Sequence, residues 1–239
     1  MESIEALHRS RHPSLLWKRI RPTTALPLDT TDDVDPLLPQ RPLQNSYWAT
    51  PILLASEYPA DRSDEITTMK LTALLDVGIR DFYDLTEDGE LQSYEQILES
   101  IVTERGWSYE GYGSVGQAES PVAANNATII VRHRRFSIQD GGLPDRSTLH
   151  GVLQAIQDSA SQDRKAVVHC AGGIGRTGTI VGCWLVQSGS VNQAEGQSAG
   201  QEALSVLKRK WRGVEKNWRA PQTPESAQQM AFVRAFTPI

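Results

Sequence analysis

The sequence predicts an α/β fold, with a central, largely parallel sheet of about four or five strands and helices on both faces. Three observations lead to this prediction. Short apolar segments alternate along the chain with amphipathic helical segments, which is typical of parallel strands joined by helices. Hydrophobic residues make up 39% of the 239 residues, enough to form a core. The strand at 165–169 leads through a glycine-rich loop directly into an apolar helix.

The chain divides near residue 40 into two parts. Residues 1–40 mix Arg, His, Pro, Thr and Asp without a sustained hydrophobic period, so we interpret them as a flexible N-terminal arm. The basic start of this arm, from Arg9 to Arg21, also carries Leu15, Leu16 and Trp17, and its docking on the domain or on a partner is an alternative. Residues 41–239 are predicted to form a single domain.

Hydrophobic spacing and flanking residues define the elements of this domain. Segments 47–48 and 51–59 are two short strands about a turn, and Ser63 and Asp64 then cap a helix that Gly78 ends. The remaining expected elements, in chain order, are a strand at 79–85, a helix at 94–106, a strand at 107–112, a surface loop at 114–127, a strand at 128–138, a helix from near 145 through 156, the strand at 165–169, a helix that starts near 176 and includes the apolar run 179–187, and helices at 191–211 and 224–236.

Charge, hydropathy and cysteine content narrow the function class. The net charge of -5 gives no global signal for nucleic acid or for an anionic membrane surface. No apolar run is long enough to span a bilayer and the N-terminus lacks a signal peptide, so we expect a cytoplasmic protein. Helix geometry puts Cys170 and Cys183 ~10 Å or more apart, beyond disulfide reach. Cys183 is expected in the core, with a redox partnership to Cys170 as the alternative.

The stretch from His169 to Gly178, HCAGGIGRTG, is the candidate active site. A strand, a tight loop and a helix start follow one another, which turns backbone N–H groups toward one point at the positive end of the helix dipole. Glycines in the loop permit the close approach of an anion. Cys170 is the candidate nucleophile, because helix N-termini and nearby cations favour the thiolate. Arg176 offers a planar fork of donors for two oxygens of one phosphate.

HCAGGIGRTG resembles the signature loop of the cysteine-dependent protein tyrosine phosphatases, C-x5-R followed by Ser or Thr. Segments 47–59 and 84–87 are similar to the opening of small dual-specificity phosphatases, though less specifically. The resemblance implies a phosphatase of the atypical dual-specificity-like branch, which forms a cysteinyl-phosphate. We expect no metal or organic cofactor, since His and Cys are too few and badly spaced for a zinc site. The implied phosphate-binding residues are Ala171, Gly172, Gly173, Ile174, Gly175 and Arg176.

Two aspartates are candidates for the general acid that protonates the leaving oxygen. Asp140 ends a strand and opens a Gly-Gly loop, and the order Asp140-x-Gly142-x-Pro144 resembles the acid loop of atypical dual-specificity phosphatases. Asp145 follows a proline, as the acid does in larger tyrosine phosphatases, but Leu143 stands where they have tryptophan. Asp145 also lies where a helix needs a capping carboxylate. We favour Asp140.

Other residues are expected to support these groups. Thr177 is predicted to donate its hydroxyl to the sulfur of Cys170, with capping of the helix start as the alternative. His169 is expected to be a hydrogen-bonding residue behind the nucleophile rather than the base. Glu87, in the loop after its strand, is a candidate to hold the guanidinium of Arg176, with an ordinary exposed acid as the alternative.

Less specific signals come from the polar residues elsewhere. Gln228 or Gln229 is a candidate to place the hydrolytic water, as a glutamine does in some relatives. The basic run from Arg132 to Arg135 alternates faces on a strand, and it either lines a pocket entrance or belongs to a solvated edge strand.

Substrate choice is the least determined property. Positions 171–175 carry no lysine or arginine, which lowers the expectation of a multiply phosphorylated substrate. We expect a monomer acting on phosphotyrosine in proteins or peptides, together with phosphoserine or phosphothreonine if the pocket is shallow. A phosphoinositide or a small phosphorylated metabolite is the second candidate. A binding module without turnover is the alternative from a different class. No nucleic-acid partner is expected.

Overall fold

The structure, a computed structural model, describes residues 39–111, 129–191 and 196–239. All of them lie in one compact unit, Asp33–Ile239. Most of the arm expected at residues 1–40 and the whole of the surface loop expected at 114–127 fall outside the described ranges. Among the helices in these ranges, none is both long and apolar enough to cross a membrane.

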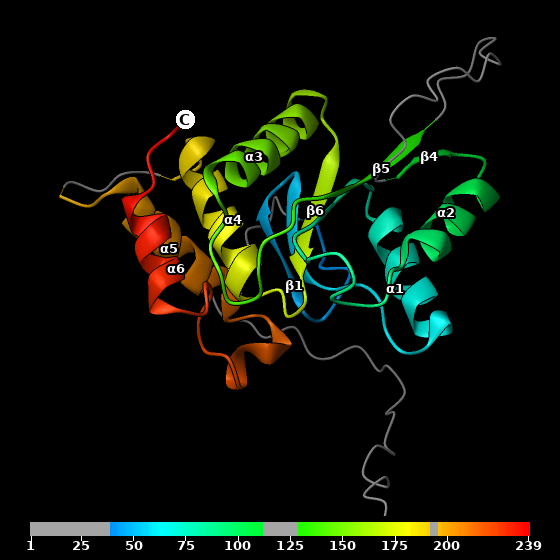
Figure 1. Cartoon of the computed structure of the whole chain (residues 1–239), viewed down its shortest axis with the longest axis horizontal. Helices are drawn as coiled ribbons and strands as arrows, with labels where there is room; N and C mark the ends of the chain where they lie inside the picture. Colours follow the sequence, from blue (N-terminus) through cyan, green and yellow to red (C-terminus); the bar gives the residue numbers. More distant parts are fainter. Residues whose placement is uncertain (1–38, 112–128, 192–195) are drawn as a thin grey trace, which may run out of the picture. The chain divides into compact units, whose positions relative to one another are not determined.

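A six-stranded sheet forms the centre of the unit, in the order β1-β2-β6-β3-β5-β4 (Figure 1). Only β1 and β2 pair antiparallel, and every other neighbouring pair is parallel. The expected count of four or five strands was too low, because both the hairpin strand β1 and the three-residue strand β4 join the sheet as its edges. The strands are β1 Ser46–Thr50, β2 Leu53–Glu57, β3 Ile79–Asp84, β4 Ser108–Glu110, β5 Ile130–Arg135 and β6 Lys165–Cys170.

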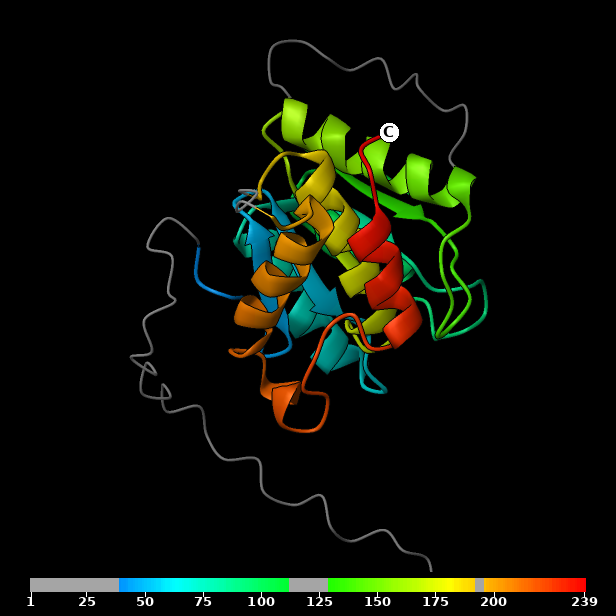
Figure 2. The ribbon, with the colours of Figure 1, turned by 90° about the vertical axis from the view of Figure 1, so that its left-hand side faces the viewer.

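Helices cover both faces of the sheet, as the sequence predicted. One face carries α1 Asp64–Asp76 and α2 Glu95–Glu104, and the opposite face carries α3 Arg146–Ser161, α4 Gly175–Gln187, α5 Ala199–Trp211 and α6 Ala227–Ala235 (Figures 1 and 2). The short 3₁₀ helix η1, Glu215–Trp218, lies between α5 and α6 in the sequence.

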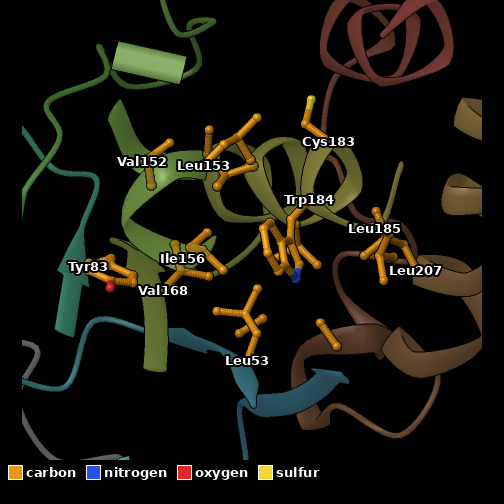
Figure 3. Packing of buried hydrophobic residues seen from close by; sticks show 14 of the residues in the cluster. Leu53, Tyr83, Val152, Leu153, Ile156, Val168, Cys183, Trp184, Leu185 and Leu207 are labelled. Atoms are coloured by element: carbon orange, nitrogen blue, oxygen red, sulfur yellow. The ribbon is translucent and has the colours of Figure 1, made fainter. Parts of the chain in front are cut away.

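Two hydrophobic cores result from this layering, because successive strand residues point to opposite faces. Leu54, Phe82 and Val167 are buried in the core beneath α1 and α2. Leu53, Tyr83 and Val168 are buried in the other core, beneath α3 to α6. In Figure 3 the ring of Trp184 extends from α4 toward Leu53, whereas the thiol of Cys183 lies on the other side of the helix. Cys183 is fully buried in this core, as expected.

The ends of two helices differ from the predicted ranges because serine side chains fix where those helices begin. The helix expected at 191–211 was too long: α5 starts at Ala199, where the side chain of Ser198 accepts a hydrogen bond from the backbone N–H of Gln201. The last helix starts at Ala227 rather than near 224. Ser226 and Gln229 form a capping box there, each side chain bonding the backbone of the other residue.

The parallel topology determines where the functional loops meet. Carboxyl ends of parallel strands lie at one edge of a sheet, and the loops that follow them form the usual ligand site of open α/β folds. The loop after β6 holds the signature residues, the loop after β3 holds Glu87 and Glu90, and the segment after β5 holds Asp140.

Candidate active site

The loop after β6 has its carbonyl groups bonded outward and its N–H groups unused. Three carbonyl oxygens accept hydrogen bonds from groups outside the loop, namely Ala171 O from Tyr58 N at 3.2 Å, Gly172 O from Lys216 Nζ at 3.2 Å and Ile174 O from Thr223 Oγ1 at 2.8 Å. The N–H groups of residues 171–174 donate to no residue within the described ranges. A trans peptide unit points its C=O and N–H in opposite directions, so this arrangement leaves a set of free donors for an anion.

Gly173 allows this loop to lie against the end of β2. Its φ is +73°, and a Cβ added there would lie 2.6 Å from the backbone N of Glu57 and 2.7 Å from the carbonyl of Ser56. Any side chain would therefore push the loop off the strand. At Gly172 the nearest atom to an added Cβ is a side-chain carbon of Ile174 at 3.4 Å, an ordinary contact.

Cys170 and Arg176 are placed at the two ends of the loop. Cys170 is the last residue of β6 and Arg176 is the second residue of α4. Their exposed fractions are only 3% and 2%. The N-terminus of α4 thus begins five residues after the sulfur, as the spacing predicted.

Glu90, and not Glu87, holds the guanidinium of Arg176. Nη1 donates to Oε2 of Glu90 at 2.7 Å and Nη2 donates to Oε1 at 2.6 Å, and Nη1 also donates to the carbonyl of Ile138 at 3.0 Å. The expectation for Glu87 was wrong because its side chain is exposed and its backbone N–H donates to Glu90 at 3.0 Å. In this turn the side chain of Glu90, the fourth residue, points toward Arg176.

Arg176 and Glu90 each stabilise the charged form of the other. Burial alone would lower the pKa of Arg176, but its hydrogen bonds to Glu90 and the electrostatic influence of Cys170, Glu90 and Asp140 raise it above its ordinary value. The hydrogen bonds from Arg176 hold the pKa of Glu90 below its usual range. Arg176 therefore stays a cation in a fixed orientation.

The two candidate acids occupy different surroundings. Asp140 is 80% exposed, and its Oδ1 lies 2.9 Å from Nη2 of Arg176. Asp145 is the N-cap of α3, where it accepts a hydrogen bond from Thr148 N at 2.7 Å, and this bond lowers the pKa of its carboxyl group. Asp140 is the one that the fold brings to the signature loop, whereas Asp145 has the capping position of the alternative interpretation.

Thr177 follows Arg176 and His169 precedes Cys170, and the two differ in their hydrogen bonds. The hydroxyl of Thr177 is buried and has no hydrogen-bond partner among the described residues, so neither the predicted bond to Cys170 nor the alternative cap is formed. His169 Nε2 shares a hydrogen bond of 2.6 Å with the hydroxyl of Tyr94, and its Nδ1 lies 3.8 Å from Asp84. Burial lowers the pKa of His169 to about 4. The imidazole is therefore neutral and serves as a hydrogen-bonding residue behind Cys170.

Residues near the C-terminus complete the surroundings of the loop. Gln229 is buried, its Nε2 donates to the carbonyl of Gly142 at 3.2 Å, and its amide lies 3.0 Å from a Cβ added at Gly175. Gln228 is exposed. Lys216 and Thr223 were not predicted, since no local pattern links them to the loop. For Glu90 the signal was available, because it lies in the same acidic turn as Glu87.

The described part of the chain holds no group of three or more His, Cys, Asp or Glu side chains arranged to bind a metal ion. The groups that can carry chemistry are a thiol, a fixed guanidinium, unused amides and one exposed carboxyl.

Sequence comparison identifies a protein family and several curated proteins that are similar to parts of the chain. Residues 115–190 match the family described as "Polymorphic toxin system, DSP-PTPase phosphatase". The tyrosine-protein phosphatase CDC14 homolog of Schizosaccharomyces pombe is 30% identical over 56 residues, which are 23% of this chain and 10% of that protein. Cyclin-dependent kinase inhibitor 3 of Sus scrofa is 33% identical over 58 residues, which are 24% of this chain and 26% of that protein. The chain thus spans about a quarter or less of these relatives.

Two solved structures have the same fold over most of the chain. The active form of Tk-PTP has a TM-score of 0.52 and 22% identity, and the likeness covers 79% of this chain and 93% of that one. Kinase associated phosphatase, with its catalytic-site cysteine substituted by serine, has a TM-score of 0.51 and 17% identity, covering 79% and 90%. Part of the chain that includes the signature loop is thus similar to the DSP-PTPase phosphatase family, and the fold of the chain is that of these two phosphatase structures.

Proposed function

We propose that the protein is a phosphomonoester hydrolase of the tyrosine or dual-specificity type. One observation carries the proposal: the loop that starts at Cys170 has unused amides at residues 171–174 and ends at the guanidinium of Arg176, which Glu90 holds in place. Amides and a guanidinium in fixed positions stabilise the equatorial oxygens of a transferring phosphoryl group. A thiolate beneath them is a nucleophile for phosphorus.

The reaction proceeds in two displacements. The sulfur of Cys170 attacks phosphorus in line, the P–O bond to the leaving group breaks, and Asp140 gives its proton to the leaving oxygen. Asp140 then takes a proton from a water molecule, whose oxygen attacks the cysteinyl-phosphate. The S–P bond breaks, and inorganic phosphate and the thiolate are released. Before the first step the phosphate displaces the carboxylate of Asp140 from Nη2 of Arg176, with which it pairs at 2.9 Å, and the displaced carboxylate takes up from solvent the proton that it later donates.

Phosphorylated tyrosine in proteins or peptides is the substrate that we propose first, with phosphoserine and phosphothreonine accepted to a lesser extent. The cationic groups nearest the loop support a singly phosphorylated ligand. Arg176 is paired with Glu90. Lys216 donates a hydrogen bond to the carbonyl of Gly172 and forms an ion pair with Glu57, with 2.5 Å between Nζ and Oε2. Neither leaves a spare cation for a second phosphate group.

A direct assay tests the proposal. The full chain should hydrolyse p-nitrophenyl phosphate, the Cys170→Ser variant should not, and the Cys183→Ala variant should remain active because its side chain is in the core. A panel of phosphotyrosine, phosphoserine and phosphothreonine peptides and of phosphoinositides then ranks the substrates. Absence of turnover in the wild type would favour the binding module, and a preference for phosphoinositides would contradict the proposed substrate class.

We also propose that the protein acts as a monomer in the cytoplasm. Both cysteines are free, and the cytoplasm is a compartment that keeps thiols reduced. Light scattering after size-exclusion chromatography tests the oligomeric state, and imaging of the tagged full chain tests the compartment.

A further inference from the structure

Lys216 reaches the signature loop from η1, a segment that follows α5. Its ammonium group donates to Gly172 O at 3.2 Å and pairs with Oε2 of Glu57 at 2.5 Å, and only 13% of its side chain is exposed. A lysine this far from solvent has lost most of its hydration, so its two partners must replace that hydration. The contact with the loop is therefore part of a built site and not the chance position of a surface side chain.

A closed set of contacts holds Lys216 in place. Its backbone N–H donates to Oδ1 of Asn45 at 3.1 Å, and Nδ2 of Asn45 donates to the same oxygen of Glu57 at 3.2 Å. The backbone of Glu57 in turn bonds to the carbonyl of Asn45 at 3.1 Å and leaves no room for a side chain at Gly173. Asn45, Glu57 and Lys216 thus connect the start of the sheet, the end of β2 and η1 at one place beside the loop.

The peptide unit that Lys216 contacts is the one with the least restraint of its own. It joins Gly172 to Gly173, and two glycines permit more backbone conformations than any other pair of residues. In a trans peptide, the carbonyl of Gly172 and the N–H of Gly173 point in opposite directions. A donor that holds the carbonyl outward therefore directs the N–H of Gly173 toward the anion.

We propose that Lys216 is a positioning residue for oxyanion binding, which acts by fixing the orientation of the Gly172–Gly173 peptide. The proposal rests on the proposed function only in taking the anion to be a phosphoryl group. Lys216 touches neither the substrate nor the reacting atoms. Its effect is on the number of amides that face the phosphate, and hence on affinity for any tetrahedral oxyanion.

Binding of tungstate to the full chain, measured by isothermal titration calorimetry, tests this role without requiring turnover. Lys216→Met keeps the length of the stem and removes the donor, and it should weaken tungstate binding by about tenfold or more, as expected for a hydrogen bond to a charged group. Lys216→Arg restores a cationic donor and should recover most of the affinity. If Lys216→Met fails to fold by circular dichroism, Lys216→Leu, which also lacks a donor, is measured in its place with the same expected loss.

A matched control lies at the start of β6, the strand that leads into the signature loop. Lys165, the first residue of β6, donates to the carbonyl of Val77 at 3.0 Å, so Lys165→Met removes the same kind of contact far from the loop. It should leave tungstate affinity unchanged. Equal losses in Lys216→Met and Lys165→Met, or no loss in either, overturn the proposal.

The outcomes separate this inference from the function itself. A wild type that binds tungstate but hydrolyses no phosphomonoester contradicts the proposed function and leaves the role of Lys216 standing if Lys216→Met binds weakly. A wild type that hydrolyses p-nitrophenyl phosphate while Lys216→Met binds tungstate normally supports the function and overturns the inference. A wild type that binds no oxyanion overturns both.

Discussion

Glu90 holds Arg176 through both of its carboxylate oxygens, at 2.7 and 2.6 Å from Nη1 and Nη2. The pair fixes a buried guanidinium in the plane from which it can meet a phosphate. Glu90→Gln should lower kcat/KM for p-nitrophenyl phosphate by about 10- to 100-fold, because it removes one acceptor from a charged, largely buried pair. Steady-state kinetics on the folded variant measures the loss.

Glu87→Gln is the control for this variant, since Glu87 lies in the same turn with its side chain exposed. Its kcat/KM should stay within about twofold of wild type, as expected for a surface residue without a charged partner in the site. If Glu87→Gln lost as much activity as Glu90→Gln, the assignment of Glu90 as the partner of Arg176 in solution would be wrong.

If Asp140 is the general acid, substitution of Asp140 should change the rate and its pH dependence, whereas substitution of Asp145 should change stability. Asp140→Asn should lower kcat for a phosphotyrosine peptide by about 100-fold and abolish the fall of the rate at high pH, because no proton remains to be donated. Asp145→Ala removes the hydrogen bond to Thr148 N and should lower the midpoint of thermal unfolding instead. The opposite assignment of the two phenotypes would make Asp145 the acid.

Gly173 and Gly172 should differ sharply in their tolerance of a methyl group. Gly173→Ala forces a positive φ on alanine, at a cost of ~1–2 kcal/mol, and places its Cβ 2.6 Å from Glu57 N. Tungstate affinity should fall at least about tenfold. Gly172→Ala meets only ordinary contacts and should bind within a few-fold of wild type. Similar affinities for the two variants would mean that the loop does not lie against β2.

The sequence could predict the residues of the loop itself, but not the distant residues that contact it. Consecutive residues encode a strand, a glycine turn and a helix start, so the location of Cys170 and Arg176 followed from the local pattern. The groups that orient the loop do not follow from it, since Lys216, Thr223 and Glu90 lie 44, 49 and 86 residues from the atoms they contact. Only the packing of α5, η1 and the turn after β3 brings them together.

The predicted start of the helix expected at 191–211 was wrong for a related reason. The helix expected at 191–211 continued its hydrophobic spacing through residues that the structure shows to be non-helical just before Ala199. A single hydrogen bond from Gln201 N to Ser198 decides the start of α5, and several serines in that region were equally plausible caps.

Cys183 should be chemically inert while the protein is folded. Burial raises the pKa of its thiol to about 12, so almost no thiolate is present near neutral pH. Iodoacetamide should therefore label one cysteine per folded chain, Cys170, and phosphate should slow that labelling. Peptide mapping by mass spectrometry identifies the labelled residue. Labelling of Cys183 before unfolding, or a disulfide between the two after mild oxidation, would favour the redox partnership.

His169 predicts a specific pH dependence of stability. Burial, opposed in part by Asp84, lowers its pKa from 6.5 to about 4 in the folded protein. Between these values the unfolded chain binds a proton that the folded chain does not, so the free energy of unfolding must fall as the pH falls from 6.5 to 4. A shift of this size corresponds to a loss of up to ~3 kcal/mol across that window.

Substituting His169 separates its contribution from those of the carboxyl groups. The pKa values of Asp84 and Glu90 are lowered from their ordinary values of 3.8 and 4.5, so the stability that these carboxyl groups contribute is lost as the pH falls through those values and below. Urea unfolding at a series of pH values should give a clearly smaller slope between pH 4 and 6.5 for His169→Gln than for wild type. His150→Gln, on the exposed side of α3, is the control and should keep the wild-type slope. A His169→Gln slope equal to wild type would mean that folding leaves the pKa of His169 at its ordinary value, so burial would not keep the imidazole neutral between pH 4 and 6.5.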